Sequence, residues 1–173
     1  MVFHNLRGYD SHLIIKNAFE VVKEGESMSA IPNSGEKVMT FSIGNLKFID
    51  SFQFMAFSLE KLVGGLTAET GDPYAKFTFM KKHFNGKEMA LIARKGFYPY
   101  EFIDDHTKLN YPGLPPKENF YSKVKLDGIS DKDYEHAQTV YNTFKCKDFG
   151  DYHWLYLKTD VLLLADVIEN FRK

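Results

Sequence analysis

The alternation of apolar and polar residues predicts strands in the N-terminal third of the chain. Val38 to Ile43 and Leu46 to Asp50 have the composition of strands, and Gly44-Asn45 between them favours a hairpin turn. Val2 to His4 is short and apolar and is a candidate for the end of another strand. Glu24 to Gly35 is rich in turn-forming residues, which predicts turns rather than a regular element.

Helical spacing of apolar residues dominates the rest of the sequence. The predicted helices are Ser11 to Lys23, Ser58 to Val63, Tyr74 to Phe84, Lys87 to Lys95, a helix that opens at Ser130, and Asp148 to Arg172. Prolines mark Gly96 to Pro116 as a surface loop, and Val161 to Ala165 are apolar on every side, which predicts deep burial or a partner that wraps the helix. Early strands and late helices indicate an α+β or three-layer α/β fold, and we expect a single domain over residues 1–173.

Composition narrows the class of protein. With 44% hydrophobic, 16% aromatic and 26% charged residues, the 173-residue chain is expected to fold around a core. The single cysteine, Cys146, excludes an internal disulfide framework and a cysteine-based zinc site, and no apolar run is long enough for a membrane span. The N-terminus has neither a signal-peptide nor a transit-peptide pattern, so we expect an intracellular protein without a membrane partner.

Charge and motifs exclude several further classes. The net charge of −1 disfavours a nucleic-acid binder with a global basic footprint. Tyr74 to Tyr100 is the one basic region, with a net charge of +5, and a solvated helix face is its simpler interpretation when it is taken alone. The sequence contains no glycine-rich phosphate loop, no nucleophile elbow and no His-Glu-x-x-His motif, and its six histidines form no i, i+4 ligand pair.

The first polar constellation is Asn5-Leu6-Arg7-Gly8-Tyr9-Asp10, which leads from the short strand into the first helix. Asp10 would lie near the positive end of the helix dipole, where a carboxylate is ionised and suited to a cation. The simpler interpretation is that Asp10 caps the helix and that Asn5 caps a turn.

The second constellation is Tyr156-Leu157-Lys158-Thr159-Asp160 on the last helix. Tyr156 and Asp160 are four residues apart and therefore share one helix face. A carboxylate next to the apolar run Val161 to Leu164 is costly to bury unpaired, so Asp160 must meet a cation, a donor, or solvent in a cleft. The alternative is a partly exposed aspartate at a helix edge, paired with Lys158 or a neighbour.

Together the two constellations resemble the second and third exonuclease motifs of family B DNA polymerases, Asn-x3-Tyr-Asp followed much later by Tyr-x3-Asp. The connecting sequence is similar to the protein-primed branch, which serves linear phages, adenoviruses, organellar plasmids and large self-synthesising DNA transposons, and it resembles the transposon polymerases most. The segments that carry the resemblance are His4 to Ile14, Phe48 to Ser51, Leu114 to Glu118 and Tyr156 to Val167. The resemblance spans essentially the whole chain.

The resemblance implies an incomplete ribonuclease-H-like fold and a 3′–5′ proofreading exonuclease within a DNA-directed DNA polymerase. In this family, four carboxylates hold two divalent metals, Mg²⁺ or Mn²⁺, for hydrolysis of a single-stranded DNA 3′ end. By resemblance, Asp10 and Asp160 are two of the metal ligands, and Tyr156 orients the attacking water. Lys117, with Phe120 three residues on, is similar to the family's lysine near the primer terminus and is the second catalytic candidate.

The same resemblance assigns the contacts to the single strand. The residues expected to touch it are His4, Asn5, Tyr9, Ser51 and Phe52. Tyr9 would act by stacking on a base. Ser51 and Phe52 stand where the protein-primed branch has a Ser-Leu pair that touches the primer strand, and Ser58-Leu59 is a rival for that role.

Two features of the family are missing from the sequence. The first exonuclease motif, Asp-x-Glu, has no match upstream of Asn5, and no polymerase palm motif occurs before Lys173. We therefore expect a partial exonuclease domain, truncated at both ends, with little or no hydrolysis by this chain alone. Its partners would be the rest of the polymerase chain and a terminal priming protein, in the nucleus for a transposon or in the mitochondrion for a linear plasmid. The alternative is a catalytically dead, transposon-derived module that binds single-stranded DNA or a protein.

Overall fold

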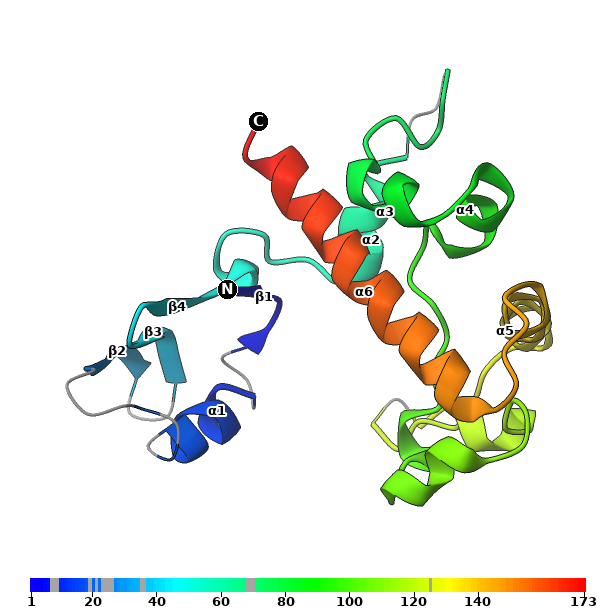
Figure 1. The fold of residues 1–173 in the computed structure, drawn as a ribbon, viewed down its shortest axis with the longest axis horizontal. Coiled ribbons are helices and arrows are strands. Elements are labelled where there is room, and N and C mark those ends of the chain that lie inside the picture. Colours follow the sequence, from blue (N-terminus) through cyan, green and yellow to red (C-terminus); the bar gives the residue numbers. More distant parts are fainter. Residues whose placement is uncertain are drawn as a thin grey trace. The chain divides into compact units, whose positions relative to one another are not determined.

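The computed structural model describes residues 1–6, 10–18, 20, 22, 27–34, 37–67, 71–124 and 126–173. The chain divides into two compact units, Met1–Ser58 and Leu59–Lys173 (Figure 1). Among the described residues, the first unit holds the sheet, and the second is helical. The α+β class predicted from the sequence is confirmed.

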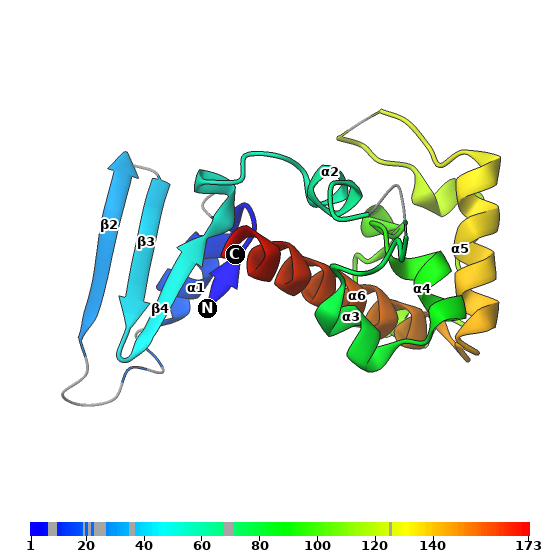
Figure 2. The same cartoon turned by 90° about the horizontal axis from the view of Figure 1, so that it is seen from above.

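The sheet of the first unit has four strands in the order β1-β4-β3-β2. β1 (Val2–Phe3) runs parallel to β4 (Leu46–Asp50), whereas β3 (Lys37–Ile43) is antiparallel to both β4 and β2 (Met28–Ser34) (Figure 2). The β3–β4 hairpin turns at Gly44, whose φ of 53° lies in the left-handed region that glycine adopts without strain. The predicted hairpin is therefore confirmed.

Strand β2 shows that the prediction of turns over Glu24 to Gly35 is wrong. Its register with β3 shifts at Pro32, and β2 lies at the edge of the sheet. An edge strand tolerates proline because the missing N–H group faces no neighbouring strand. The turn-forming residues therefore produce an irregular strand instead of a loop.

One helix packs on the sheet of the first unit. α1 (Asp10–Ala18) places Ile14 and Ile15 against a core that contains Leu6, Phe41 and Phe48. The rings of Phe41 and Phe48 stack with centroids 4.4 Å apart. The helix begins at Asp10, one residue ahead of the predicted start at Ser11, and it is described to Ala18; the predicted end at Lys23 lies outside the described residues.

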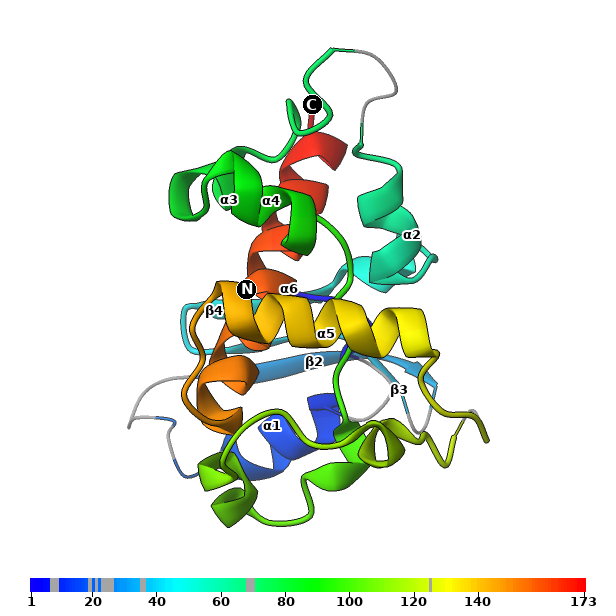
Figure 3. The ribbon, with the colours of Figure 1, turned by 90° about the vertical axis from the view of Figure 1, so that its right-hand side faces the viewer.

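The second unit is built around one long helix. Its described helices are α2 (Leu59–Gly64), α3 (Thr78–His83), α4 (Gly86–Ile92), α5 (Asp131–Thr143) and α6 (Phe149–Phe171), with the short 3₁₀ helices η3 (Tyr100–Phe102), η4 (His106–Asn110) and η5 (Lys117–Phe120) between α4 and α5. α2 and α3 pack against α6, and α4 packs against α5 (Figure 3). Within the described ranges, none of the helices has the length and apolar character that a membrane span needs.

A buried carboxylate fastens α3 to α6. Asp166 on α6 is fully buried, and its two oxygens accept hydrogen bonds from the N–H groups of Phe79 (2.7 Å) and Met80 (3.0 Å). These donors lie in the first turn of α3, where the N–H groups have no partner inside their own helix. Asp166 therefore replaces the capping side chain that the N-cap residue Phe77 does not supply.

The predicted deep burial of Val161 to Ala165 is wrong for part of that run. Val161 is 66% exposed, whereas Leu163 is fully buried. The two residues lie on different faces of α6 because successive helical positions are separated by about 100°. Within its own unit, α6 therefore buries one face and leaves another open.

The proline-rich segment Gly96 to Pro116 is more than a surface loop. Pro99 and Pro115 are fully buried. The carbonyl oxygen of Tyr111 accepts a hydrogen bond from the N–H group of Phe149, at the start of α6, with a length of 2.9 Å. Packing against α6 therefore fixes much of the segment, and this packing builds the site described next.

Candidate functional site

Three of the residues assigned to a single DNA strand meet in the first unit. His4 follows β1, and Ser51 and Phe52 open η2 (Ser51–Gln53) directly after β4, the strand parallel to β1. His4 Nδ1 lies 2.9 Å from Ser51 Oγ, and the rings of His4 and Phe52 meet edge to face with centroids 5.4 Å apart. The Nε2–H group of His4 donates to the carbonyl oxygen of Phe57 at 2.8 Å, which fixes the ring plane. Residues 47 positions apart thus form one cluster.

Asp50 holds the backbone of this cluster in place. It is 1% exposed, and its Oδ1 accepts hydrogen bonds from the N–H groups of Asn5 (2.8 Å) and Phe52 (3.0 Å). Asn5 has a φ of 66°, in the left-handed region that asparagine tolerates better than most residues, and it is exposed. The sequence prediction missed this role of Asp50, although an aspartate between a strand and Ser51 is a typical capping signal.

Two other predicted residues of the first unit lie at the start of α1. Tyr9, the predicted stacking residue, falls outside the described residues. Asp10 is exposed and is the first residue of α1, as the helix-dipole argument requires. Asp10 is therefore accessible to a cation at the positive end of the helix.

The predicted pair of the second unit, Tyr156 and Asp160, lies one turn apart on α6. Asp160 Oδ2 forms an ion pair with the ammonium group of Lys95, and the two side chains are only 21% and 28% exposed. Asp160 Oδ1 is buried and has no hydrogen-bond partner among the described residues. The partner that the sequence requires for this carboxylate is thus Lys95, 65 positions away. Lys158 instead lies over the ring of Phe84, 5.0 Å from its centroid.

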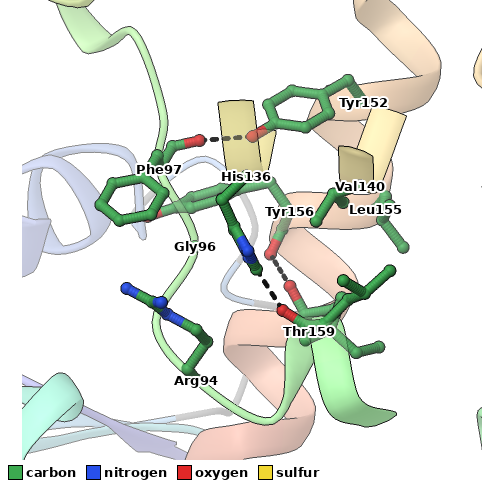
Figure 4. A pocket seen from close by; sticks show the side chains of 11 residues that line it. Arg94, Gly96, Phe97, His136, Val140, Tyr152, Leu155, Tyr156 and Thr159 are labelled. Atoms are coloured by element: carbon green, nitrogen blue, oxygen red, sulfur yellow. Dashed lines mark hydrogen bonds between the residues drawn. The ribbon is translucent and has the colours of Figure 1, made fainter. Parts of the chain in front are cut away.

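The segment after α4 surrounds Tyr156. Tyr98 stacks on Tyr156 with ring centroids 4.5 Å apart, and the hydroxyl of Tyr100 lies 2.5 Å from the hydroxyl of Tyr156. The ammonium group of Lys95 is 4.8 Å from the centroid of the Tyr156 ring. Gly96 passes so close that a Cβ there would lie 3.2 Å from the ring (Figure 4). Residues 95–100 thus form a cradle around Tyr156.

Burial favours the neutral forms of Tyr156, Tyr98 and His153 in and around this cradle. Burial raises the pKa of Tyr156 well above its ordinary value, and Tyr100 and Asp160 act in the same direction. Burial also raises the pKa of Tyr98 to about 12 and lowers the pKa of His153, whose Nδ1 lies 2.5 Å from the Tyr98 hydroxyl. At neutral pH these hydroxyl groups can therefore orient a water molecule or a phosphate oxygen by hydrogen bonding, and they do not act as bases.

Lys117, the predicted catalytic lysine, makes different contacts in the same unit. Its Nζ lies 2.6 Å from Oδ1 of Asp131, at the start of α5. Phe120 is buried, and its ring meets that of Tyr134 with centroids 5.5 Å apart. Among the described residues, the lysine that contacts Asp160 is Lys95.

Little in the sequence indicates that Lys95 is the partner of Asp160. It belongs to the basic region Tyr74 to Tyr100, where nothing separates it from the other lysines. The one local hint is the glycine that follows it, because Gly96 lets the chain approach an aromatic ring closely. A pairing across 65 positions carries no periodic signal.

A hollow lies beside Tyr156, between α4, α5 and α6 (Figure 4). Its wall is mostly apolar, and the Nε2–H group of His136 donates to the carbonyl oxygen of Leu91 at 3.0 Å. The hollow encloses about 20 Å³, which is room for about one water molecule. It is therefore too small to hold a nucleotide.

The two residues predicted as metal ligands carry donor atoms of the right kind. The carboxylate oxygens of Asp160 and Asp10 are ligands of the kind that Mg²⁺ and Mn²⁺ prefer. A cation would satisfy the buried Oδ1 of Asp160, which otherwise lacks a partner among the described residues. The described part of the chain gathers no group of three or more His, Cys, Asp or Glu side chains, so a four-carboxylate site is not complete within it.

Comparison of the chain with protein-family models, with curated proteins and with solved structures finds no match. Function is therefore inferred from the chemistry of the two clusters. The first unit offers an imidazole, an amide and an aromatic ring, which suit a nucleotide base or a phosphate. The second unit offers a carboxylate, an ammonium group and a neutral phenol, which suit a cation and a water molecule.

Proposed function

We propose that this chain is the 3′–5′ exonuclease region of a protein-primed family B DNA polymerase, with a ribonuclease-H-like fold, and that it acts on a single-stranded DNA 3′ end. The observation that carries the proposal is the cluster of His4, Ser51 and Phe52. The carboxylate of Asp50 fixes its backbone by accepting a hydrogen bond from the N–H group of Phe52. The resemblance assigns both segments to the same DNA strand, and their residues meet although they are 47 positions apart. Ser51 itself is fully buried, so in this cluster it supports the His4 ring and does not reach the strand. A chance match of two short motifs would not require them to meet.

In the first unit, the proposed role is to hold the frayed 3′ end. The Phe52 ring, packed on His4, offers an aromatic surface to a base. The exposed Asn5 can donate and accept hydrogen bonds, and its backbone is fixed by Asp50. The Ser51 hydroxyl donates to the carbonyl oxygen of Phe3 at 2.8 Å and lies 2.9 Å from Nδ1 of His4, so it helps to hold the His4 ring in place.

In the second unit, the proposed role is to support hydrolysis. Asp160 is the proposed metal ligand of this unit, as Asp10 is by the same resemblance in the first, and Mg²⁺ or Mn²⁺ would supply the charge that stabilises the attacking and leaving oxygens. Tyr156 keeps its proton because burial raises its pKa, so it orients a water molecule without deprotonating it. Lys117 stays the proposed lysine near the primer terminus, and Lys95 is the lysine whose ammonium group contacts Asp160.

The same proposal fixes the partners. The rest of the polymerase chain and a terminal priming protein would complete the enzyme, in the nucleus for a transposon or in the mitochondrion for a linear plasmid. Asp10 and Asp160 are two of the four carboxylates that such an exonuclease needs, so we expect little or no hydrolysis by this chain alone. DNA binding is therefore the property to measure first.

Binding of a 5′-fluorescein-labelled single-stranded oligonucleotide, followed by anisotropy at low salt, tests the proposal. Phe52→Ala removes the ring that packs on His4, and we expect about a tenfold increase in Kd, since stacking of one base contributes about 1–3 kcal/mol. Tyr121→Ala is the matched control, because Tyr121 is an exposed aromatic residue outside both clusters. Equal affinities of the wild type, Phe52→Ala and Asn5→Ala would overturn the proposal.

The ion pair of Lys95 with Asp160 favours a second candidate, a catalytically dead, transposon-derived module that binds single-stranded DNA or a protein. A carboxylate whose charge is balanced by a lysine does not need a metal. The basic region Tyr74 to Tyr100 would supply phosphate contacts, and binding would then fall steeply with salt. The two candidates differ in the effect of Mn²⁺ on DNA binding. The exonuclease region should bind the oligonucleotide more tightly with Mn²⁺ and lose that gain in Asp160→Ala, whereas the module should bind it equally with and without Mn²⁺.

A further inference from the structure

The ammonium group of Lys95 lies where a cation would be expected. It forms an ion pair with Asp160 Oδ2 and lies 4.8 Å from the centroid of the Tyr156 ring. Both neighbours of the ammonium group attract positive charge: Asp160 through its carboxylate, and Tyr156 through the negative face of its ring. Lys95 therefore fills a site that is built for a cation.

The same site is only half satisfied by a lysine. Asp160 Oδ1 is buried without a hydrogen-bond partner among the described residues, although an ionised carboxylate can accept several hydrogen bonds. The Lys95 side chain is a flexible stem and is 28% exposed, so its ammonium group can leave toward solvent at moderate cost. A backbone N–H group bound to Asp160 instead of Lys95 could not leave in this way, because the fold would hold it in place.

We propose that Lys95 and a divalent cation compete for the carboxylate of Asp160, and that Lys95 thereby determines how tightly this carboxylate binds Mg²⁺ or Mn²⁺. The proposal rests on the proposed function for Asp160 as a metal ligand and for the choice of cation. Whatever favours the ion pair opposes the cation by the same factor, because the two equilibria share one carboxylate. Lys95 is thus a residue that sets cation affinity, and not only a contact for DNA.

A second consequence follows from the same competition. A cation on Asp160 releases the ammonium group of Lys95, which then becomes available to a phosphate oxygen. Binding of the cation and binding of DNA would therefore strengthen each other through Lys95, and the two effects are equal in size by linkage. Without Lys95, this coupling is lost while the carboxylate remains.

Titration of the full chain with Mn²⁺, with the free ion measured by electron paramagnetic resonance, tests the proposal without any need for activity. We expect Lys95→Met to bind Mn²⁺ about tenfold more tightly than the wild type, a size typical of a coupled pair. The double variant Lys95→Met/Asp160→Asn should lose that gain. Thermal unfolding of each variant checks that it is folded.

Lys108→Met is the matched control for the change in net charge. Lys108 also combines an aspartate with an aromatic ring, since its Nζ lies 3.9 Å from Asp104 Oδ1 and 4.9 Å from the centroid of Phe102. We expect its Mn²⁺ affinity to equal that of the wild type. An equal gain in Lys108→Met would show that net charge alone is responsible and would overturn the proposal.

The remaining outcomes separate this proposal from the proposed function. Mn²⁺ affinity of Lys95→Met that equals the wild type, or that persists when Asp160 is also replaced, overturns the competition even if Phe52→Ala weakens DNA binding. A tenfold gain that depends on Asp160 supports the competition even if the oligonucleotide binds no differently in Phe52→Ala. Failure of one proposal is therefore visible independently of the other.

Discussion

Two carboxylates, one in each unit, have opposite kinds of partner. Asp50 is 1% exposed and accepts hydrogen bonds from the backbone N–H groups of Asn5 and Phe52. Asp160 has one oxygen on a lysine ammonium group and the other buried without a partner among the described residues. A backbone donor is held by the fold, whereas a lysine on a flexible stem can exchange with another cation.

This difference indicates which groups of each cluster are available to a ligand. In the first unit, the carboxylate of Asp50 fixes the backbone, and the side chains of His4, Asn5 and Phe52 provide the contact surface. In the second unit, the carboxylate of Asp160 is itself the group that the proposal makes a ligand, and residues 95–100 pack around the neighbouring Tyr156. The two clusters therefore differ in whether the carboxylate supports the ligand-contacting groups or is one of them.

Replacing Asp50 has the largest expected effect. Asp50→Ala leaves the N–H groups of Asn5 and Phe52 without their acceptor, and we expect the free energy of unfolding to fall by about 3 kcal/mol. Asp160→Ala, the matched change in the second unit, should cost less than about 1 kcal/mol, because it removes a single ion pair that solvent partly screens. Urea denaturation followed by far-UV circular dichroism measures both.

A rescue variant makes this comparison sharper. Asp50→Asn keeps an acceptor oxygen at the same position, so it should recover most of the stability that Asp50→Ala loses. If Asp50→Ala were no less stable than Asp160→Ala, the division between a structural and an exchangeable carboxylate would be wrong.

A side chain at Gly96 tests the support of Tyr156. A Cβ there would lie 3.2 Å from Cδ2 of Tyr156, and valine adds two methyl groups at a position that is already tight. We expect Gly96→Val to lower the free energy of unfolding by about 2 kcal/mol through overpacking. The hydrogen bond between the hydroxyls of Tyr156 and Tyr100 should break, which near-UV circular dichroism of the tyrosines detects.

Gly86 provides the matched control for that substitution. A Cβ at Gly86, the first residue of α4, would meet no atom within 4 Å. Gly86→Ala should therefore leave the stability unchanged or raise it slightly, since alanine favours a helix. A Gly96→Val protein with wild-type stability and an unchanged tyrosine signal would show that the cradle does not constrain Tyr156.

Local patterns predicted most of the fold. The hairpin and the main helices follow from short-range spacing, which depends only on neighbouring residues. Strand β2 was missed because its pairing with β3 outweighs the turn preference of Pro32. The exposure of Val161 was missed because an apolar run does not reveal which face of α6 has a neighbour.

The site was predicted less completely than the fold, because its contacts join residues that are far apart in the sequence. Tyr156 and Asp160 are one helical turn apart, so their shared face follows from the sequence. Lys95 reaches Asp160 across 65 positions, and Asp50 reaches Asn5 across 45, and neither contact has a local signal. Only tertiary packing decides such pairs.

Acid should destabilise the second unit through two partly buried imidazoles, and this is the smallest of the expected effects. Burial lowers the pKa of His153 and of His136 below 6.5, with Arg94 acting the same way on His136 while the Leu91 carbonyl and Asp133 oppose it. The folded protein then binds fewer protons than the unfolded chain as the pH falls below about 6.5. The neutral imidazoles therefore contribute fully to the free energy of unfolding above that pH. This contribution is lost as the pH falls toward the lowered pKa values that His136 and His153 have in the folded protein.

Trp154, the one tryptophan, lies beside His153 and follows the unfolding of this unit by fluorescence. The urea midpoint of the wild type should be lower at pH 5 than at pH 7. His136→Gln keeps a donor for the Leu91 carbonyl but does not titrate, so its midpoint should fall less. An equal fall in both proteins would assign the acid response to carboxylates. The stability of the second unit would then depend on acidic groups, as that of the first depends on Asp50. The two units would differ only in the kind of partner that Asp160 has.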